Sequence, residues 1–177
     1  MKNVLITALF LSALFLISCE NAQKAQNSAN IQQNKNASTE TKSKEVPTER
    51  HIKIKSENSF DETYAALKKA IELQEPLTII AELDHSANAK KAGMELRPTK
   101  VIMFGNPKLG TPLMKSNQAI GVDLPQKMLV YEDEKGDVYV VYNDPKILAE
   151  NHGISGQDEV LNKISEALKS LAEAATR

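Results

Sequence analysis

The pattern of apolar and polar residues divides the chain into three stretches. Residues 4–17 form an almost unbroken apolar run, and residues 20–50 are almost entirely polar. In residues 51–177, apolar residues recur at the periods typical of strands and helices. This third stretch is therefore predicted to be a single globular domain, and its elements can be placed one by one.

The domain is predicted to open with a strand and an amphipathic helix. Residues 51–55 alternate polar and apolar, as a half-buried strand does. Ser59 and Glu62 have the spacing of a capping box, in which the side chain of each residue accepts a hydrogen bond from the backbone amide of the other. The helix is expected to reach Leu73, before Pro76. Its apolar face is formed by Phe60, Tyr64, Leu67 and Ile71.

A run of strands is predicted to follow. Residues 77–83 are expected to form a buried strand, and residues 87–93 a short helix that ends at Gly93. Residues 101–104 are strongly apolar and predict a strand that runs into Gly105. Two more strands, 127–132 and 137–142, are joined by a four-residue hairpin turn at 133–136.

Two helices are predicted to complete the domain. Asn143 or Asp144 caps a short helix with Pro145 in its first turn, and Gly153 ends it. The last helix has one apolar stripe, made of Val160, Leu161, Ile164, Leu168 and Leu171. The order β-α-β(4)-α predicts an α+β fold, a mostly antiparallel sheet with helices on one face.

The first nineteen residues have the pattern of a bacterial lipoprotein signal. Lys2 precedes the apolar run, which ends in a small residue, Ser18, directly before Cys19. Fourteen helical residues would span about 21 Å, which is short of a ~30 Å hydrocarbon core. Residues 1–18 are therefore predicted to be a cleaved signal peptide and Cys19 the lipidation site. An ordinary cleaved signal and an uncleaved anchor are the alternatives.

The composition of the chain limits the classes of partner that it can bind. With 22 basic and 23 acidic residues, the chain has no charge excess that would favour nucleic acid or an anionic surface. Residues 19–50, the acylated cysteine and a linker, have no aromatic residue and are predicted to be disordered. The sequence thus predicts a membrane-anchored envelope lipoprotein on the periplasmic or extracellular side, with no disulfide and no nucleic-acid partner.

Three central motifs resemble a known family. Residues 96–114 contain a Phe-Gly-Asn-Pro loop and a Gly-Thr pair, and the motifs 123–125 (Asp-Leu-Pro) and 142–145 (Tyr-Asn-Asp-Pro) follow. Together they resemble the prokaryotic domain-of-unknown-function family three-hundred-and-two over essentially all of residues 51–177. The resemblance implies a fold similar to one half of the TATA-binding protein, often dimeric. It implies no activity and, because fold does not fix function, no DNA binding.

The motif segment, residues 105–111, is the first candidate site. Its two glycines would let a ligand approach the backbone, and amides and side chains there could hold an anion. Thr111 stands where a P-loop needs lysine, so nucleotide binding of that type is excluded. The candidate ligand-binding residues are Gly105, Asn106, Lys108, Gly110 and Thr111. The alternative is that the glycines and prolines only shape a turn.

Three residues are candidates for acid–base chemistry. Asp84 and His85 follow a predicted strand, and Asp123 precedes another. The histidines have no metal-ligand spacing, no nucleophile motif is present, and neither a metal nor a cofactor is expected.

Three functions follow from these observations. The first is a non-enzymatic domain that binds a small molecule, an anion or a partner through residues 105–111. The second is a hydrolase- or lyase-like enzyme acting on a small anionic substrate with Asp84, His85 and Lys108. The third is a structural homodimer in which the motif segment packs against a second copy.

Overall fold

A computed structural model describes residues 50–177 of the chain. The predicted signal peptide (residues 1–18), the lipidation site Cys19 and the linker up to residue 49 lie outside these residues. Within residues 50–177, no helix is both long enough and apolar enough to cross a membrane.

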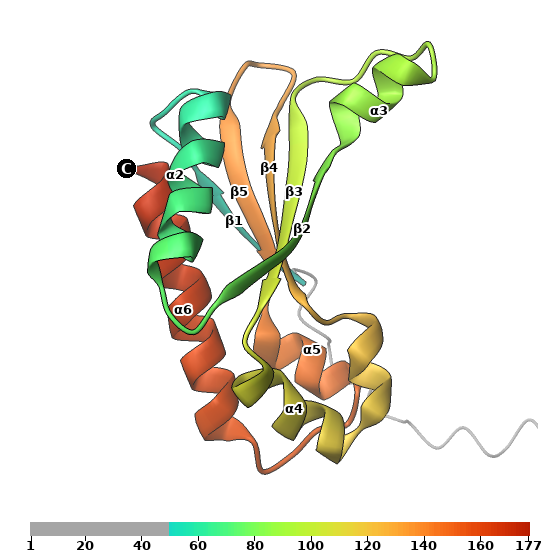
Figure 1. Ribbon diagram of the computed structural model, residues 1–177, viewed down its shortest axis with the longest axis vertical. Helices are drawn as coiled ribbons and strands as arrows, with labels where there is room; N and C mark the ends of the chain where they lie inside the picture. Colours follow the sequence, from blue (N-terminus) through green and yellow to red (C-terminus); the bar gives the residue numbers. More distant parts are fainter. Residues whose placement is uncertain (1–49) are drawn as a thin grey trace, which may run out of the picture. The chain divides into compact units, whose positions relative to one another are not determined.

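A five-stranded antiparallel sheet forms the centre of the domain (Figure 1). Its strands are β1 (His51–Lys55), β2 (Thr78–Asp84), β3 (Thr99–Gly105), β4 (Gln126–Glu132) and β5 (Val138–Asn143). They lie in the order β1-β5-β4-β3-β2, so the first strand of the chain pairs with the last. The predicted α+β class and the antiparallel sheet with helices are confirmed.

Two long helices, α2 (Phe60–Leu73) and α6 (Asp158–Thr176), lie on the same face of the sheet (Figure 1). Alternate residues of β5 and β4 are buried beneath them, because strand side chains point to opposite faces in turn. The core includes, from the sheet, Ile102, Phe104, Met128, Val130, Val138, Val140 and Tyr142, and from α2 and α6 Phe60, Leu67, Ile71, Leu161, Ile164, Leu168 and Leu171. These residues make one continuous core, formed entirely within the described part of the chain.

The predicted helix start at Ser59 is confirmed. The Glu62 carboxylate accepts hydrogen bonds from the Ser59 backbone amide at 3.1 Å and from the Ser59 hydroxyl at 2.6 Å. These bonds satisfy one of the amides that the first turn of a helix leaves unpaired. Beneath the cap, the buried hydroxyls of Ser56 and Thr63 lie 2.7 Å apart and join the residue after β1 to α2.

Three short helices and a 3-10 turn lie between the longer elements, and the last of these helices joins β5 to α6. They are α3 (His85–Lys91), α4 (Pro107–Ser116), η1 (Gln118–Val122) and α5 (Pro145–Asn151). The predicted hairpin is present, and Gly136 adopts φ +81° in its turn. Gly93 (φ +73°) and Gly153 (φ +61°) follow α3 and α5, as predicted.

The prediction for β2 was wrong in one respect, because it is an edge strand and not a buried one. It pairs on one side only, with β3, and Ile80 is 60% exposed. Its pairing register also shifts between Ile79 and Ala81, which is a β-bulge. Part of the apolar run of residues 77–83 lines a cleft beside this strand.

Candidate functional site

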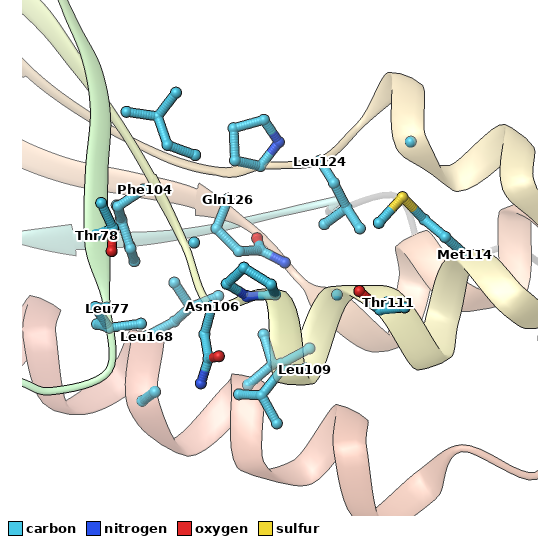
Figure 2. Close-up of a pocket in the computed structure, with 18 residues that line it drawn as sticks. Leu77, Thr78, Phe104, Asn106, Leu109, Thr111, Met114, Leu124, Gln126 and Leu168 are labelled. Carbon is cyan, nitrogen blue, oxygen red and sulfur yellow. The ribbon is translucent and has the colours of Figure 1, made fainter.

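A cleft of about 490 Å³ lies at the end of the sheet where β3 runs into α4. Four segments form it: the start of β2, the β3–α4 junction, the segment from η1 to β4, and the middle of α6. Figure 2 shows Leu124 and Gln126 on one side of the cleft and Asn106 and Leu109 on the other. The cleft therefore depends on residues that are distant in sequence and are brought together by the fold.

The lining of the cleft is almost entirely apolar. Its large side chains are Leu77, Ile80, Phe104, Leu109, Met114, Leu124, Ile164 and Leu168. Four polar side chains reach it, those of Thr78, Asn106, Thr111 and Gln126. None of the residues that line the cleft in the described part of the chain is acidic, basic, histidine or cysteine. Such a lining suits an apolar molecule with few hydrogen-bonding groups.

The motif segment is the start of a helix and not an extended loop. Asn106 is the N-cap of α4, and its Oδ1 accepts a hydrogen bond from the Lys108 backbone amide at 2.9 Å. Pro107 occupies the first helical position, where its missing amide costs nothing. The backbone amides that were expected to hold an anion are therefore largely hydrogen-bonded within the helix and its cap.

The candidate ligand residues separate on the two sides of this helix. Gly105, Asn106, Gly110 and Thr111 line the cleft, whereas the Lys108 side chain does not. Lys108 lines a shallower, more polar hollow of about 530 Å³ on the other side of α4. That hollow is completed by Pro107, Thr111, Pro112, Lys115, Ser116 and Gln157. Pro107 and Thr111, one turn apart, line both spaces.

Three glycines face the cleft without any need for glycine in the backbone. Gly105, Gly110 and Gly121 all have ordinary φ values. A Cβ on Gly110 would lie 3.7 Å from Leu124, and one on Gly121 would lie 3.6 Å from the Met114 sulfur, which are normal contacts. Neither backbone strain nor a clash explains these glycines, so their effect is to leave space in the cleft.

Asp84 and His85 do not join this site. Asp84 is the N-cap of α3, where its carboxylate accepts hydrogen bonds from the Ala87 amide at 2.8 Å and from the Ser86 hydroxyl at 2.7 Å. Those two bonds hold the pKa of Asp84 below its ordinary value. The cleft lies at the opposite end of β2, about 20 Å away at ~3.3 Å per residue. The structure therefore does not bring Asp84 and His85 together with Lys108.

Asp123 pairs with His152, to which no sequence motif connects it. Asp123 Oδ2 lies 2.6 Å from His152 Nε2, and the His152 side chain is 15% exposed. The Asn117 side-chain amide donates to the His152 backbone carbonyl at 2.8 Å. Together these bonds attach the end of α5 to the η1 segment, beside the cleft wall at Gly121 and Leu124. In the described residues, no group of three or more His, Cys, Asp or Glu side chains has metal-site geometry.

Comparison with known proteins identifies the family. Residues 52–171 match the family described as domain of unknown function DUF302. This chain belongs to the DUF302 family. The match covers all five strands, apart from His51 at the start of β1, and it includes α6 as far as Leu171. The resemblance inferred from residues 96–145 is therefore confirmed.

A solved member of the family has the same fold as this DUF302 domain. The crystal structure of the uncharacterized conserved protein DUF302 from Bacillus stearothermophilus aligns with a TM-score of 0.64 at 19% identity. The alignment covers 72% of this chain and 98% of that protein. The likeness therefore extends over nearly the whole of that solved chain.

Curated relatives of this DUF302 chain are named as channels. It is 38% identical over 115 residues to the fluoride-specific ion channel FluC 1 of Brucella suis biovar 1 (strain 1330), which covers 63% of this chain and 44% of that protein. The same identity is found with the fluoride-specific ion channel FluC 2 of Brucella melitensis biotype 1, of which 41% is covered. This chain therefore spans less than half the length of the curated relatives it matches.

Proposed function

We propose that this DUF302 domain binds a small, largely apolar molecule in the cleft, as a non-enzymatic part of an envelope lipoprotein. The observation that supports this proposal is the cleft itself. Its volume of about 490 Å³ falls in the range of roughly 300–1,000 Å³ that is common for small-molecule sites. The few polar groups on its walls are enough to orient a ligand.

The apolar lining changes the class of ligand from the one expected from residues 105–111. A bare anion placed among Leu109, Leu124 and Phe104 would lose its hydration without gaining a charged partner, which is unfavourable. The same argument applies to fluoride, the ion in the names of the curated relatives. An uncharged, apolar molecule would instead gain free energy by leaving water.

Enzymatic use of the cleft has little support from its chemistry. Acid–base catalysis needs a titratable group within hydrogen-bond reach of the reacting atoms. In residues 50–177 the cleft walls supply only amides and hydroxyls. The enzyme built on Asp84, His85 and Lys108 would need groups that this fold places at two ends of a strand.

Binding is tested with the purified 50–177 domain and two probes, neutral 1-naphthol and sodium fluoride. We expect 1-naphthol to raise the melting temperature and to give a saturable heat in titration calorimetry, and fluoride to do neither. Leu124→Asp, which puts a charge on the wall, should abolish naphthol binding, while Lys146→Asp, at an exposed position of α5, should not. Saturable fluoride binding, or no effect of either probe, would contradict the proposal.

The anchor is the second half of the proposal. It is supported by the apolar run of residues 4–17 that ends at Cys19. We expect the full chain expressed in a bacterium to sediment with membranes and to have the mass of a chain that starts at an acylated Cys19. Cys19→Ser should abolish the acylation. A full-length, unmodified mass in the cytosolic fraction would refute the anchor.

A homodimer is the second candidate function. One observation favours it: the sheet face opposite α2 and α6 carries a cross-strand row of apolar residues, Leu83, Val101, Leu129 and Val141. Leu83 is 38% exposed. Sedimentation equilibrium of the domain tests this candidate, because a monomer at all concentrations would exclude it. Leu129→Lys should dissociate a dimer formed through this face.

A further inference from the structure

We infer that the cleft binds the aliphatic chain of a single-chain amphiphile with an anionic head, a fatty acid or a lysophospholipid. The inference rests on the proposed function and names the ligand class of the same site. Three observations lead to it: the glycines that widen the cleft, the two lysines across α4, and the point at which the chain enters the domain.

The glycines indicate a long ligand, because they keep side chains out of the cleft along its length. Gly110 lies inside α4, and in a helix interior glycine is less favourable than alanine. Its Cβ would fit, at 3.7 Å from Leu124 and 4.0 Å from Met114. Gly121 and Gly105 likewise leave out a side chain that the fold would accept. The space they leave runs beside flexible Leu and Met side chains, which adapt to an aliphatic chain.

The lysines supply the place for the head. Lys108 and Lys115 lie two turns apart on α4 and line the polar hollow with Ser116 and Gln157. In residues 50–177 neither lysine forms a salt bridge, although seven such pairs occur in the domain. Only the ridge of Pro107 and Thr111 separates this hollow from the cleft. An amphiphile lying over that ridge would put its chain among apolar groups and its anionic head near two cations.

The chain enters the domain at the same end of the sheet. His51 pairs with Asn143, and the successive registers place Gln126, Gly105 and Thr78 at that end as well. The last three of these residues line the cleft. The segment that carries Cys19 therefore joins the domain at its cleft end. The membrane that would hold the proposed anchor is a source of such lipids.

The test uses calorimetry and native mass spectrometry on the 50–177 domain, whose core is complete. The probes are dodecanoate and lauroyl-lysophosphatidylglycerol, both kept below their micellar concentrations, with butanoate as the short-chain control and 1-naphthol as the compact apolar control. We expect one equivalent of each long-chain probe to bind, at least about tenfold more tightly than butanoate. Similar binding of both sources supports recognition of the shared chemistry, and binding of one alone identifies the source.

Variants separate the chain from the head. Gly110→Leu should reduce dodecanoate binding by at least about tenfold while leaving the domain folded, whereas Ser170→Leu, which adds the same side chain on the exposed face of α6, should change nothing. Gly110→Ala provides a milder version with no loss of helix propensity. Lys108→Gln together with Lys115→Gln should weaken dodecanoate and leave 1-naphthol unaffected.

The outcomes distinguish this inference from the proposed function. Naphthol binding without long-chain binding overturns the inference and leaves the proposed function standing. Failure of every probe overturns both. Dodecanoate binding that is insensitive to Gly110→Leu and to the lysine pair would place the lipid elsewhere on the domain and would also overturn the inference.

Discussion

His152 Nε2 lies 2.6 Å from Asp123 Oδ2, and this contact joins two segments separated by 29 residues. Asp123 precedes the residues that form one wall of the cleft, and His152 ends α5. Lys127 supports the same wall, because its ammonium donates to the backbone carbonyls of Asp123 at 2.9 Å and of Pro125 at 3.1 Å. The cleft wall is thus held by side chains that do not touch the ligand space.

Loss of this pair is expected to destabilise the domain. We predict that His152→Gln lowers the free energy of unfolding by about 1 kcal/mol, because the partly buried Asp123 carboxylate loses its partner. Urea denaturation followed by circular dichroism measures the change. His85→Gln is the matched control, since His85 is exposed at the start of α3. Equal effects of the two substitutions would contradict a specific role for the pair.

Glu82 is expected to make stability fall in acid. Hydrogen bonds from Lys68 at 2.7 Å and from Tyr64 at 2.8 Å hold its pKa below the ordinary value of 4.5. A carboxyl group with a lowered pKa in the folded state stabilises that state above its unfolded pKa. This contribution is lost as the pH falls below 4.5 and through the folded pKa.

The measurement for Glu82 is the urea midpoint as a function of pH. Between pH 4.5 and lower values, wild-type stability should decline more steeply than that of Glu82→Gln, which carries no titrating group at this position. Glu75→Gln, at an exposed site, should keep the wild-type slope. Parallel curves for Glu82→Gln and the wild type would contradict the prediction.

Removing the Ser165 hydroxyl is expected to stabilise the domain. Among the described residues, its Oγ is buried without a hydrogen-bond partner. An unsatisfied buried hydroxyl costs free energy, so Ser165→Ala should raise the free energy of unfolding by about 1 kcal/mol. Ser170→Ala, on the exposed side of the same helix, measures the gain from helix propensity alone. If both variants gain equally, the hydroxyl carries no penalty.

The hairpin turn is expected to depend on Gly136. Its φ of +81° disfavours any residue with a Cβ, although a Cβ there would touch nothing within 4 Å. Gly136→Ala should therefore cost about 1 kcal/mol through backbone conformation alone. Gly136→Asn should cost less, because asparagine tolerates positive φ. Thermal unfolding of the two variants gives the comparison, and an order reversed from this one would be a failure.

The sequence was sufficient for elements that are defined by local chemistry. The Ser59–Glu62 cap, the turn at Gly136 and the stripe on α6 each depend on residues a few positions apart, so their patterns are visible in the chain. The motif of residues 96–114 likewise indicated the family, which the match to residues 52–171 confirmed.

The site could be predicted only in part. Gly105, Asn106, Gly110 and Thr111 do line the cleft, but its apolar character comes from Leu77, Leu124 and Leu168, which are distant in sequence. Asp123 and His152 are 29 residues apart and share no motif, so nothing in the chain indicated their pairing. The edge position of β2 was also hidden, because the apolar run that suggested burial within a sheet partly lines the cleft.

The two borders of the sheet have a consequence for self-association. The bulge between Ile79 and Ala81 interrupts the free backbone row of β2, and β1 on the other border is five residues long with lysines at 53 and 55. Bulges, short length and lysines all make a border strand a poor template for another chain. Neither border of the sheet therefore favours amyloid-like stacking of one copy of the domain on the next.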